Sequence, residues 1–173
     1  MRIGLLYSII LTICLSLCCC NSPVNLSDQN AAENAVSLVV LGTVQDAGSP
    51  HIGCKKECCK ALFIQSDKTR KVTSLGLINH KSSKTWLIEA TPDIATQLND
   101  LKRLSNHTEE LPNGILLTHA HIGHYSGLMY LGKEAINADS LNVFAMPRMK
   151  EFLETNGPWS QLITNKNIDL VSI

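Results

Sequence analysis

The sequence predicts a layered domain of mixed strands and helices, of the α/β or α+β class. Short apolar, β-branched runs dominate its first half, and strand patterns alternate with helical patterns in its second half. The chain has 173 residues, about one domain, and its apolar content of 45% is enough for a buried core. The formal net charge is zero, so composition gives no reason to expect nucleic acid as a partner.

The expected elements follow one another along the chain. Residues 35–42 form an apolar run that ends at a glycine, which predicts a buried strand. Thr91 suits a helix N-cap and Pro92 a first turn, and apolar residues follow at helical spacing. The remaining expected strands are 71–79, 84–90, 114–118, 141–146 and 167–173, and the remaining helices 125–138 and 147–157. Because an unpaired apolar strand closes the sequence, we expect it to be the N-terminal part of a larger domain.

The N-terminus carries the pattern of an export signal. Arg2 precedes an apolar run that is shorter than the roughly 20 residues needed to span a bilayer. The run ends in "LSLCCC", which resembles the lipobox of bacterial lipoproteins, with Cys18 as the best lipidation candidate and Cys19 or Cys20 as alternatives. We therefore expect a signal at 1–20, a flexible polar tether at 21–35 and a folded domain at 36–173. Plain signal cleavage is one alternative, and a cytosolic protein with a buried N-terminal helix is another.

Three of the six histidines lie within "GILLTHAHIGHYSGL", directly after a predicted strand. His119 and His121 are two residues apart, so on an extended strand end both rings point the same way. His124 follows where the chain turns toward a helix. Imidazole is a common ligand for zinc and also suits iron. The cluster therefore predicts a metal site, held by His119, His121 and His124.

A second group of candidate ligands lies in the predicted loop at 43–60. Cys54, Cys58 and Cys59 follow His51 closely, and thiolate with imidazole suits tetrahedral zinc. In an exported protein a disulfide from Cys54 to Cys58 or Cys59 is the competing interpretation. Unpaired loop cysteines are the third.

The histidine motif resembles the His-x-His-x-Asp-His signature of the metallo-β-lactamase superfamily. More narrowly, "VVLGTVQDAGSPHIGC", "WLIEATPDI" and the histidine segment resemble proteins related to the pyrroloquinoline quinone biosynthesis protein B. The resemblance covers residues 37–165. It implies an αββα sandwich, of which this sequence would hold the N-terminal half, and a structural zinc at the cysteine loop.

The resemblance also implies roles for the histidines. His119 and His121 would hold one metal ion, and His124 would help to hold a second. The signature's aspartate belongs to that second site, but this sequence has Gly123 there, which offers no ligand. One or two zinc ions are implied, with iron or manganese as alternatives. Further ligands of the family lie beyond Ile173, so this stretch by itself could be inactive.

We therefore expect an exported hydrolase, anchored to the membrane by a lipid on the periplasmic or cell-surface side, that uses a metal-activated water on a small-molecule substrate. A non-haem iron oxygenase related to quinone-cofactor biosynthesis is one alternative, and a non-catalytic surface binding lipoprotein is another. Outside the clusters we expect structural roles: Asp46 as a turn residue, Glu89 and Asp93 as helix-start charges, and Trp159 as a packing aromatic. For Asp46, a place beside the metal or facing the substrate is the alternative.

Overall fold

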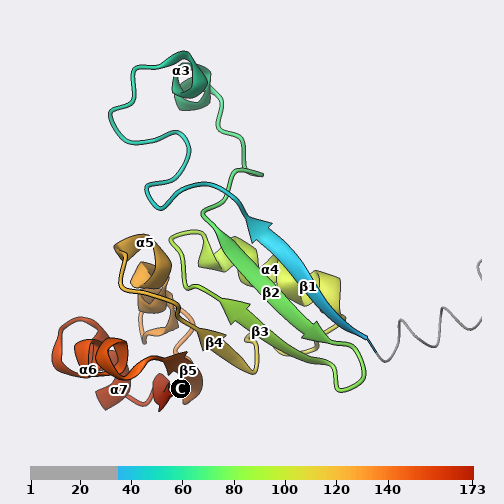
Figure 1. The fold of residues 1–173 in the computed structure, drawn as a ribbon, viewed down its shortest axis with the longest axis vertical. Coiled ribbons are helices and arrows are strands. Elements are labelled where there is room, and N and C mark those ends of the chain that lie inside the picture. Colours follow the sequence, from blue (N-terminus) through green and yellow to red (C-terminus); the bar gives the residue numbers. More distant parts are fainter. Residues whose placement is uncertain (1–34) are drawn as a thin grey trace, which may run out of the picture. The chain divides into compact units, whose positions relative to one another are not determined.

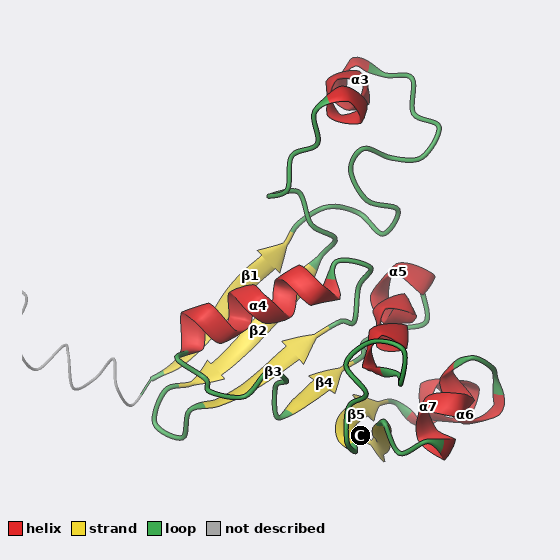
Figure 2. Cartoon of the chain, turned by 180° about the vertical axis from the view of Figure 1, so that it is seen from behind, coloured by secondary structure: helices red, strands yellow, loops and turns green. Residues whose placement is uncertain are grey.

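A computed structural model of the chain describes residues 35–173, which belong to one compact unit (Figures 1 and 2). The expected export signal at 1–20, the tether as far as residue 34, and the lipidation candidate Cys18 lie outside the described residues. Within 35–173, no helix has both the length and the apolar character needed to cross a membrane.

The domain is built on one six-stranded sheet in which the strands lie side by side in chain order. The strands β1 to β3 pair antiparallel, and β3 to β6 run parallel to one another. Their bounds are β1 Val36–Gly42, β2 Ser74–Asn79, β3 Lys84–Ile88, β4 Gly114–Leu116, β5 Leu141–Ala145 and β6 Ile168–Ser172. This confirms a mixed α/β fold, and each expected strand is present, one to three residues shorter than predicted.

The helices supply the other half of a single apolar core. In both views α4 (Ile94–Ser105) lies across β1, β2 and β3 (Figures 1 and 2). The 3-10 helix η1 (Ser126–Leu131), α6 (Pro147–Thr155) and α7 (Trp159–Thr164) contribute to the same core. Its fully buried members from strands and helices include Leu87, Ile115, Val143, Leu101, Leu128 and Leu153. Residues 35–173 therefore form one sheet and one helical layer.

The opposite face of β1 carries apolar side chains that this layer does not cover. Val36, Leu38 and Val40 are 59%, 60% and 66% exposed, whereas Leu41 is buried. The period of two places successive side chains on opposite faces of the sheet. Both faces of this strand are therefore apolar, as in the sheet of a sandwich.

Three elements differ from the sequence-based expectation. The helix α3 (Glu57–Ile64) lies in the excursion between β1 and β2, where a loop was predicted through residue 60. The predicted helix at 125–138 is a short α5 (Ile122–Tyr125) followed by η1, and it ends at Leu131 because Gly132 is extended. The helix α7 was not predicted, since its six residues are too few to show a helical period.

The strand directions bring three chain segments to one edge of the sheet. Because β1 and β3 are both antiparallel to β2, they point the same way, and β4 is parallel to β3. The segments that leave β1, β3 and β4 at their carboxyl ends therefore meet at this edge. In open α/β sheets, the carboxyl ends of the strands are the usual place for a ligand site.

Candidate metal centre

The three histidines converge where the chain leaves β4. Each of His119, His121 and His124 offers one ligand atom, and these three atoms all lie within 4.8 Å of one another. The ring centroid of His119 is 4.5 Å from that of His121 and 4.3 Å from that of His124. The rings of His119 and His121 are exposed, whereas His124 is buried. The structure thus places the predicted ligands together, with two of them open to a substrate.

Local backbone structure explains this convergence. The strand β4 ends at Leu116, so His119 and His121 lie on the segment after the strand rather than on the strand itself. His121 is the N-cap of α5, and the single turn of α5 carries His124 back beside the other rings. The backbone N–H of Ala90, after β3, donates to the carbonyl of His124 at 2.8 Å, which fixes this turn against the neighbouring strand.

Asp46 joins the histidines from the segment after β1. Its Oδ1 lies 3.0 Å from His124 Nε2, and its Oδ2 lies 3.4 Å from His121 Nδ1. Partial burial would raise the pKa of Asp46, but the hydrogen bond with His124 and the nearby His124 and His121 rings bring that pKa below its usual value. The carboxylate is therefore ionised and faces two of the three rings. Asp46 lies in a turn, as expected, because the N–H of Gly48 donates to the carbonyl of Gln45, but its side chain faces the histidines.

Glu89 lies behind the histidines and was expected only as a helix-start charge. It is 5% exposed, with a backbone φ of 75°, and follows β3. Its Oε1 accepts hydrogen bonds from the backbone N–H and the hydroxyl of Thr118. Its Oε2 lies 3.5 Å from His124 Nδ1, and neither of these two buried atoms has a hydrogen-bond partner among the described residues. Glu89 therefore faces the ring of His124 from the side opposite to Asp46.

These contacts select the nitrogen that the rings of His124 and His119 can offer to a cation. The carboxylate of Glu89 favours a proton on His124 Nδ1, so His124 Nε2 can give up the proton that it shares with Asp46 when a cation binds. The Thr118 hydroxyl donates to Glu89 and lies 2.8 Å from His119 Nδ1, so it can accept a proton from that ring. His119 Nε2 is then the free donor. A carboxylate or hydroxyl behind each ring is the usual environment of metal-binding histidines.

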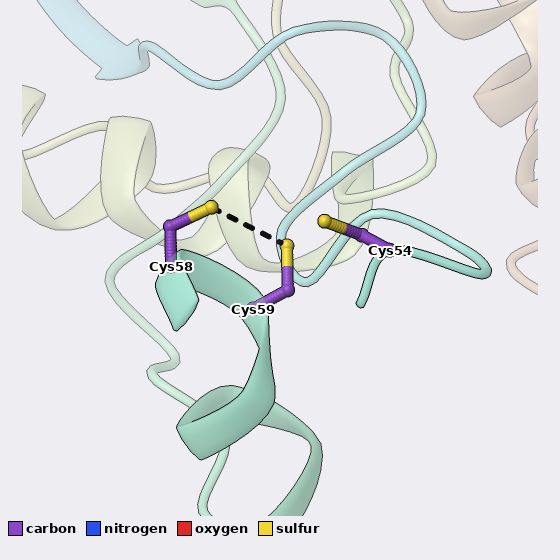
Figure 3. Close-up of side chains that lie close together, drawn as sticks. All are labelled: Cys54, Cys58 and Cys59. Carbon is purple, nitrogen blue, oxygen red and sulfur yellow. Dashed lines mark hydrogen bonds between the residues drawn. The ribbon is translucent and has the colours of Figure 1, made fainter. Parts of the chain in front are cut away.

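The cysteines form a second group, at the start of α3. Cys54 precedes the helix, and Cys58 and Cys59 lie in its first turn. Their three sulfur atoms lie within 4.8 Å of one another, and all three thiols are free. Figure 3 shows the sulfurs turned toward one another, with 4.0 Å between those of Cys58 and Cys59. His51 does not join this group; its Nδ1 contacts the carbonyl of Ile52 instead.

Comparison with known proteins places this arrangement in a known fold. No family model and no curated protein matches the sequence. A solved structure of Zn²⁺-bound PqqB from Methylobacterium extorquens matches with a TM-score of 0.60 and 20% identity, over 80% of this chain and 49% of that protein. A diphosphatase from the PhnP family matches with a TM-score of 0.55 and 20% identity, over 80% of this chain and 50% of that protein. Both have the same fold. The chain has the metallo-β-lactamase fold.

The chain spans about half the length of these two metallo-β-lactamase-fold structures. The expected fold class is confirmed. The described residues supply one sheet with its helical layer, and the histidine segment lies at the edge of this sheet where β4 ends.

Gly123, at the aspartate position of the metallo-β-lactamase-fold signature, has no room for a side chain. A Cβ atom there would lie 2.6 Å from the Cβ of Asp46 and 2.8 Å from its carbonyl oxygen, closer than real Cβ atoms approach other atoms. The glycine is therefore required by close contact with Asp46. A carboxylate is present at this end of the signature, but it comes from residue 46.

The ligand atoms gathered at this site suit a divalent cation. Three imidazoles and one ionised carboxylate lie at the edge of the sheet, with a buried carboxylate behind them. Imidazole binds zinc, iron and copper, and carboxylate oxygen also accepts manganese. Residues His119, His121 and His124 can therefore hold such an ion, and Cys54, Cys58 and Cys59 form a separate soft-ligand group.

Proposed function

We propose that the protein is a metal-dependent hydrolase, in which His119, His121 and His124 hold a divalent cation. One observation carries this proposal: three imidazole ligand atoms within 4.8 Å of one another, at the carboxyl end of β4 in a metallo-β-lactamase fold. Zinc is the first candidate, because one structural neighbour is described as Zn²⁺-bound, and iron and manganese suit the same donors. When bound, such an ion would lower the pKa of a coordinated water toward about 7 and polarise the bond under attack.

The protein's own groups orient the rings and keep the site open. The carboxylate of Glu89 lies 3.5 Å from His124 Nδ1, and the Thr118 hydroxyl lies 2.8 Å from His119 Nδ1, so both side chains limit how these rings can turn. The exposed rings of His119 and His121 leave the site accessible to a small-molecule substrate. The carboxylate of Asp46, which is 37% exposed, faces the rings of His121 and His124 and adds a negative charge beside the ligands.

The substrate class to test first contains phosphoanhydride and phosphodiester bonds. One of the two structural neighbours is a diphosphatase. Hydrolysis of such bonds needs a cation to neutralise the developing charge, which fits a site built from imidazoles and a carboxylate. Carboxylic esters and amides form the comparison panel.

The test is a hydrolysis assay of the zinc-loaded full chain and its histidine variants. His119→Ala and His121→Ala are expected to lower both metal content and kcat/KM by at least a hundredfold, because each removes a ligand. His80→Ala is the matched control. His80 lies in the hairpin between β2 and β3, at the end of the sheet opposite to the site, where its ring is hydrogen-bonded to the Ser37 hydroxyl. Wild-type activity in the His119→Ala variant would contradict the proposal.

A second candidate function is a non-haem iron oxygenase. The observation that favours it is the position of Asp46 between His121 and His124, since two histidines and one carboxylate with open positions are typical of these enzymes. Oxygen uptake by the iron-loaded chain, with no hydrolysis of any panel substrate, would favour this function. Metal binding with neither activity would favour a binding protein.

We also propose that Cys54, Cys58 and Cys59 hold a structural zinc ion. Their sulfurs are free and face one another at the start of α3, within the excursion between β1 and β2 (Figure 3). Thiolates at this spacing suit tetrahedral zinc, with one position left for another ligand. Cys58→Ser is expected to lower the zinc content by one ion per chain while the histidine site still binds metal.

Export and membrane attachment remain proposals based on residues 1–20. We propose that this segment directs export to the periplasmic or cell-surface side and that Cys18 carries the lipid anchor. Labelling of cells with a tagged fatty acid is expected to mark the wild-type protein and the Cys19→Ala variant. Loss of the label in Cys19→Ala, with the label retained in Cys18→Ala, would move the anchor to Cys19.

A further inference from the structure

We propose that Asp46 is itself a metal ligand, and that it supplies from the segment after β1 the carboxylate that position 123 lacks. This inference rests on the proposed metal centre. With Asp46 the centre is a mixed imidazole–carboxylate site, formed by the segments that follow β1 and β4.

The first argument is the distance of Asp46 from two of the rings. Its Oδ1 lies 3.0 Å from His124 Nε2, and its Oδ2 lies 3.4 Å from His121 Nδ1. Ligand atoms about 2.0–2.2 Å from one shared cation lie roughly 3.0–3.5 Å from each other in octahedral or tetrahedral geometry. The oxygens of Asp46 are therefore already at the separations that ligands of one ion have.

The second argument comes from Gly123 and does not use these distances. The backbone of Asp46 lies against Gly123, with its carbonyl oxygen and Cα at 2.8 and 2.9 Å from where a Cβ atom would be. No aspartate fits at position 123 while residue 46 is there. In this arrangement the carboxylate near the histidines therefore comes from the segment after β1 and not from position 123.

The third argument is that the backbone around Asp46 is fixed on both sides. Before it, the N–H of Val44 donates to the carbonyl of Lys71 at 2.9 Å, and the carbonyl of Val44 accepts from the N–H of Thr73 at 2.8 Å. After it, the N–H of Gly48 donates to the carbonyl of Gln45 at 2.9 Å. Asp46 is therefore held in place by its own segment, as a ligand must be, instead of reaching the rings on a mobile loop.

The inference predicts which ions the site accepts. A carboxylate makes the site harder than three imidazoles alone, so it should bind Mn²⁺ and Fe²⁺ as well as Zn²⁺. The thiolates of the cysteine group prefer softer ions, so Mn²⁺ reports on the histidine site selectively.

The experiment measures Mn²⁺ binding to the full chain through the electron paramagnetic resonance signal of the free ion. Asp46→Asn is expected to weaken Mn²⁺ binding at least tenfold, because it keeps the side-chain shape but removes the charged donor. Asp67→Asn is the matched control: its side chain lies in the same excursion and is 40% exposed, against 37% for Asp46. Asp67→Asn is expected to bind Mn²⁺ within twofold of wild type.

The possible outcomes separate the role of Asp46 from the existence of the histidine metal site. Equal Mn²⁺ affinity in Asp46→Asn and wild type would overturn the role of Asp46 and leave the histidine centre intact. So would a wild-type chain that holds zinc at the histidines but leaves Mn²⁺ free. A chain that holds neither ion at the histidines would overturn the proposed function as well.

A second measurement avoids any effect of the substitution on folding. In a crystal structure of the zinc-loaded wild-type protein, a carboxylate oxygen of Asp46 is expected about 2.0–2.2 Å from the zinc ion. An oxygen of Asp46 that stays more than about 3 Å from an ion bound by the histidines would overturn the inference.

Discussion

Glu89 has a positive backbone φ although it is not a glycine. A φ of 75° is unfavourable for a residue with a Cβ, and such strain is found mainly at functional sites. The strained backbone turns the carboxylate inward, where Thr118 and His124 share it. We infer that this conformation is kept because the carboxylate orients two rings of the centre.

Replacing this carboxylate by an amide tests its orienting role. Glu89→Gln keeps the side-chain length but removes the charge that favours a proton on His124 Nδ1. Loss of such a partner typically weakens metal binding 10–100-fold, and we expect a loss in that range. Competition against a chromophoric chelator measures it, with the exposed Glu109→Gln as the control. Unchanged affinity in Glu89→Gln would mean that Glu89 serves only the fold.

Gly123 offers a second test at the scale of one residue. In Gly123→Ala the added methyl group would meet the Cβ, Cα and carbonyl oxygen of Asp46 below 3.0 Å, so the segment carrying Asp46 must move away. We expect weaker metal binding and a lower melting temperature, both measurable by thermal unfolding with and without Mn²⁺. A variant as stable and as tight in binding as wild type would show that the two segments are not in close contact.

At the scale of elements, η1 packs against the segment after β3 through a close contact at Gly127. Its N–H donates to the carbonyl of Ala90 at 2.9 Å, and a Cβ atom there would lie 2.1 Å from the carbonyl oxygen of Thr91. The same segment also bonds to the carbonyl of His124. The packing of η1 is therefore linked to the position of the metal-binding turn.

Gly127→Ala tests this link between the elements. Overpacking a tight contact typically costs about 1–3 kcal/mol, and we expect a loss of at least that size in the free energy of unfolding by urea. Gly157→Ala is the control, because a Cβ atom there has no neighbour within 4 Å; its change should stay within about 0.5 kcal/mol. Equal stability of the two variants would contradict the close packing of η1.

Local sequence patterns predicted the elements that depend on neighbours in the chain. The strands, α4 and α6 show clear periodicity, and the three histidines lie within six positions, so their convergence needs only one strand end and one helical turn. The helices α3 and α7 were missed because short helices depend more on tertiary contacts than on their own sequence. The contact of Asp46 with the histidines was not predicted for a similar reason: Asp46 is 78 residues from His124, and no local pattern reports their contact.

At the scale of the whole molecule, strand direction explains why the site lies where it does. Asp46 follows β1, Glu89 follows β3 and His119 follows β4, and these three strands end at the same edge of the sheet. Gly123 was the signal in the sequence that could have pointed to Asp46, since a ligand missing at a signature position can be supplied from another strand end. The fold thus combines residues that are distant in the sequence.

Metal binding is also expected to stabilise the whole domain, because a cation that binds only the folded state shifts the unfolding equilibrium. At a free Mn²⁺ concentration of 100 times Kd the gain is about 2.7 kcal/mol. For a domain of this size that corresponds to a rise in melting temperature of roughly 5–10 °C. Scanning calorimetry with Mn²⁺ or with a chelator measures it. The His119→Ala variant should lose this rise, and an equal rise in that variant would place the binding elsewhere.

The most direct test of the central claim is X-ray absorption spectroscopy at the zinc edge of the zinc-loaded full chain. The account predicts two shells: nitrogen and oxygen atoms at about 2.0–2.2 Å from the histidine centre, and sulfur atoms at about 2.3 Å from the cysteine group. In His119→Ala the nitrogen and oxygen shell should shrink while the sulfur shell stays. A spectrum with sulfur ligands alone, unchanged by His119→Ala, would contradict the histidine centre and the function proposed from it.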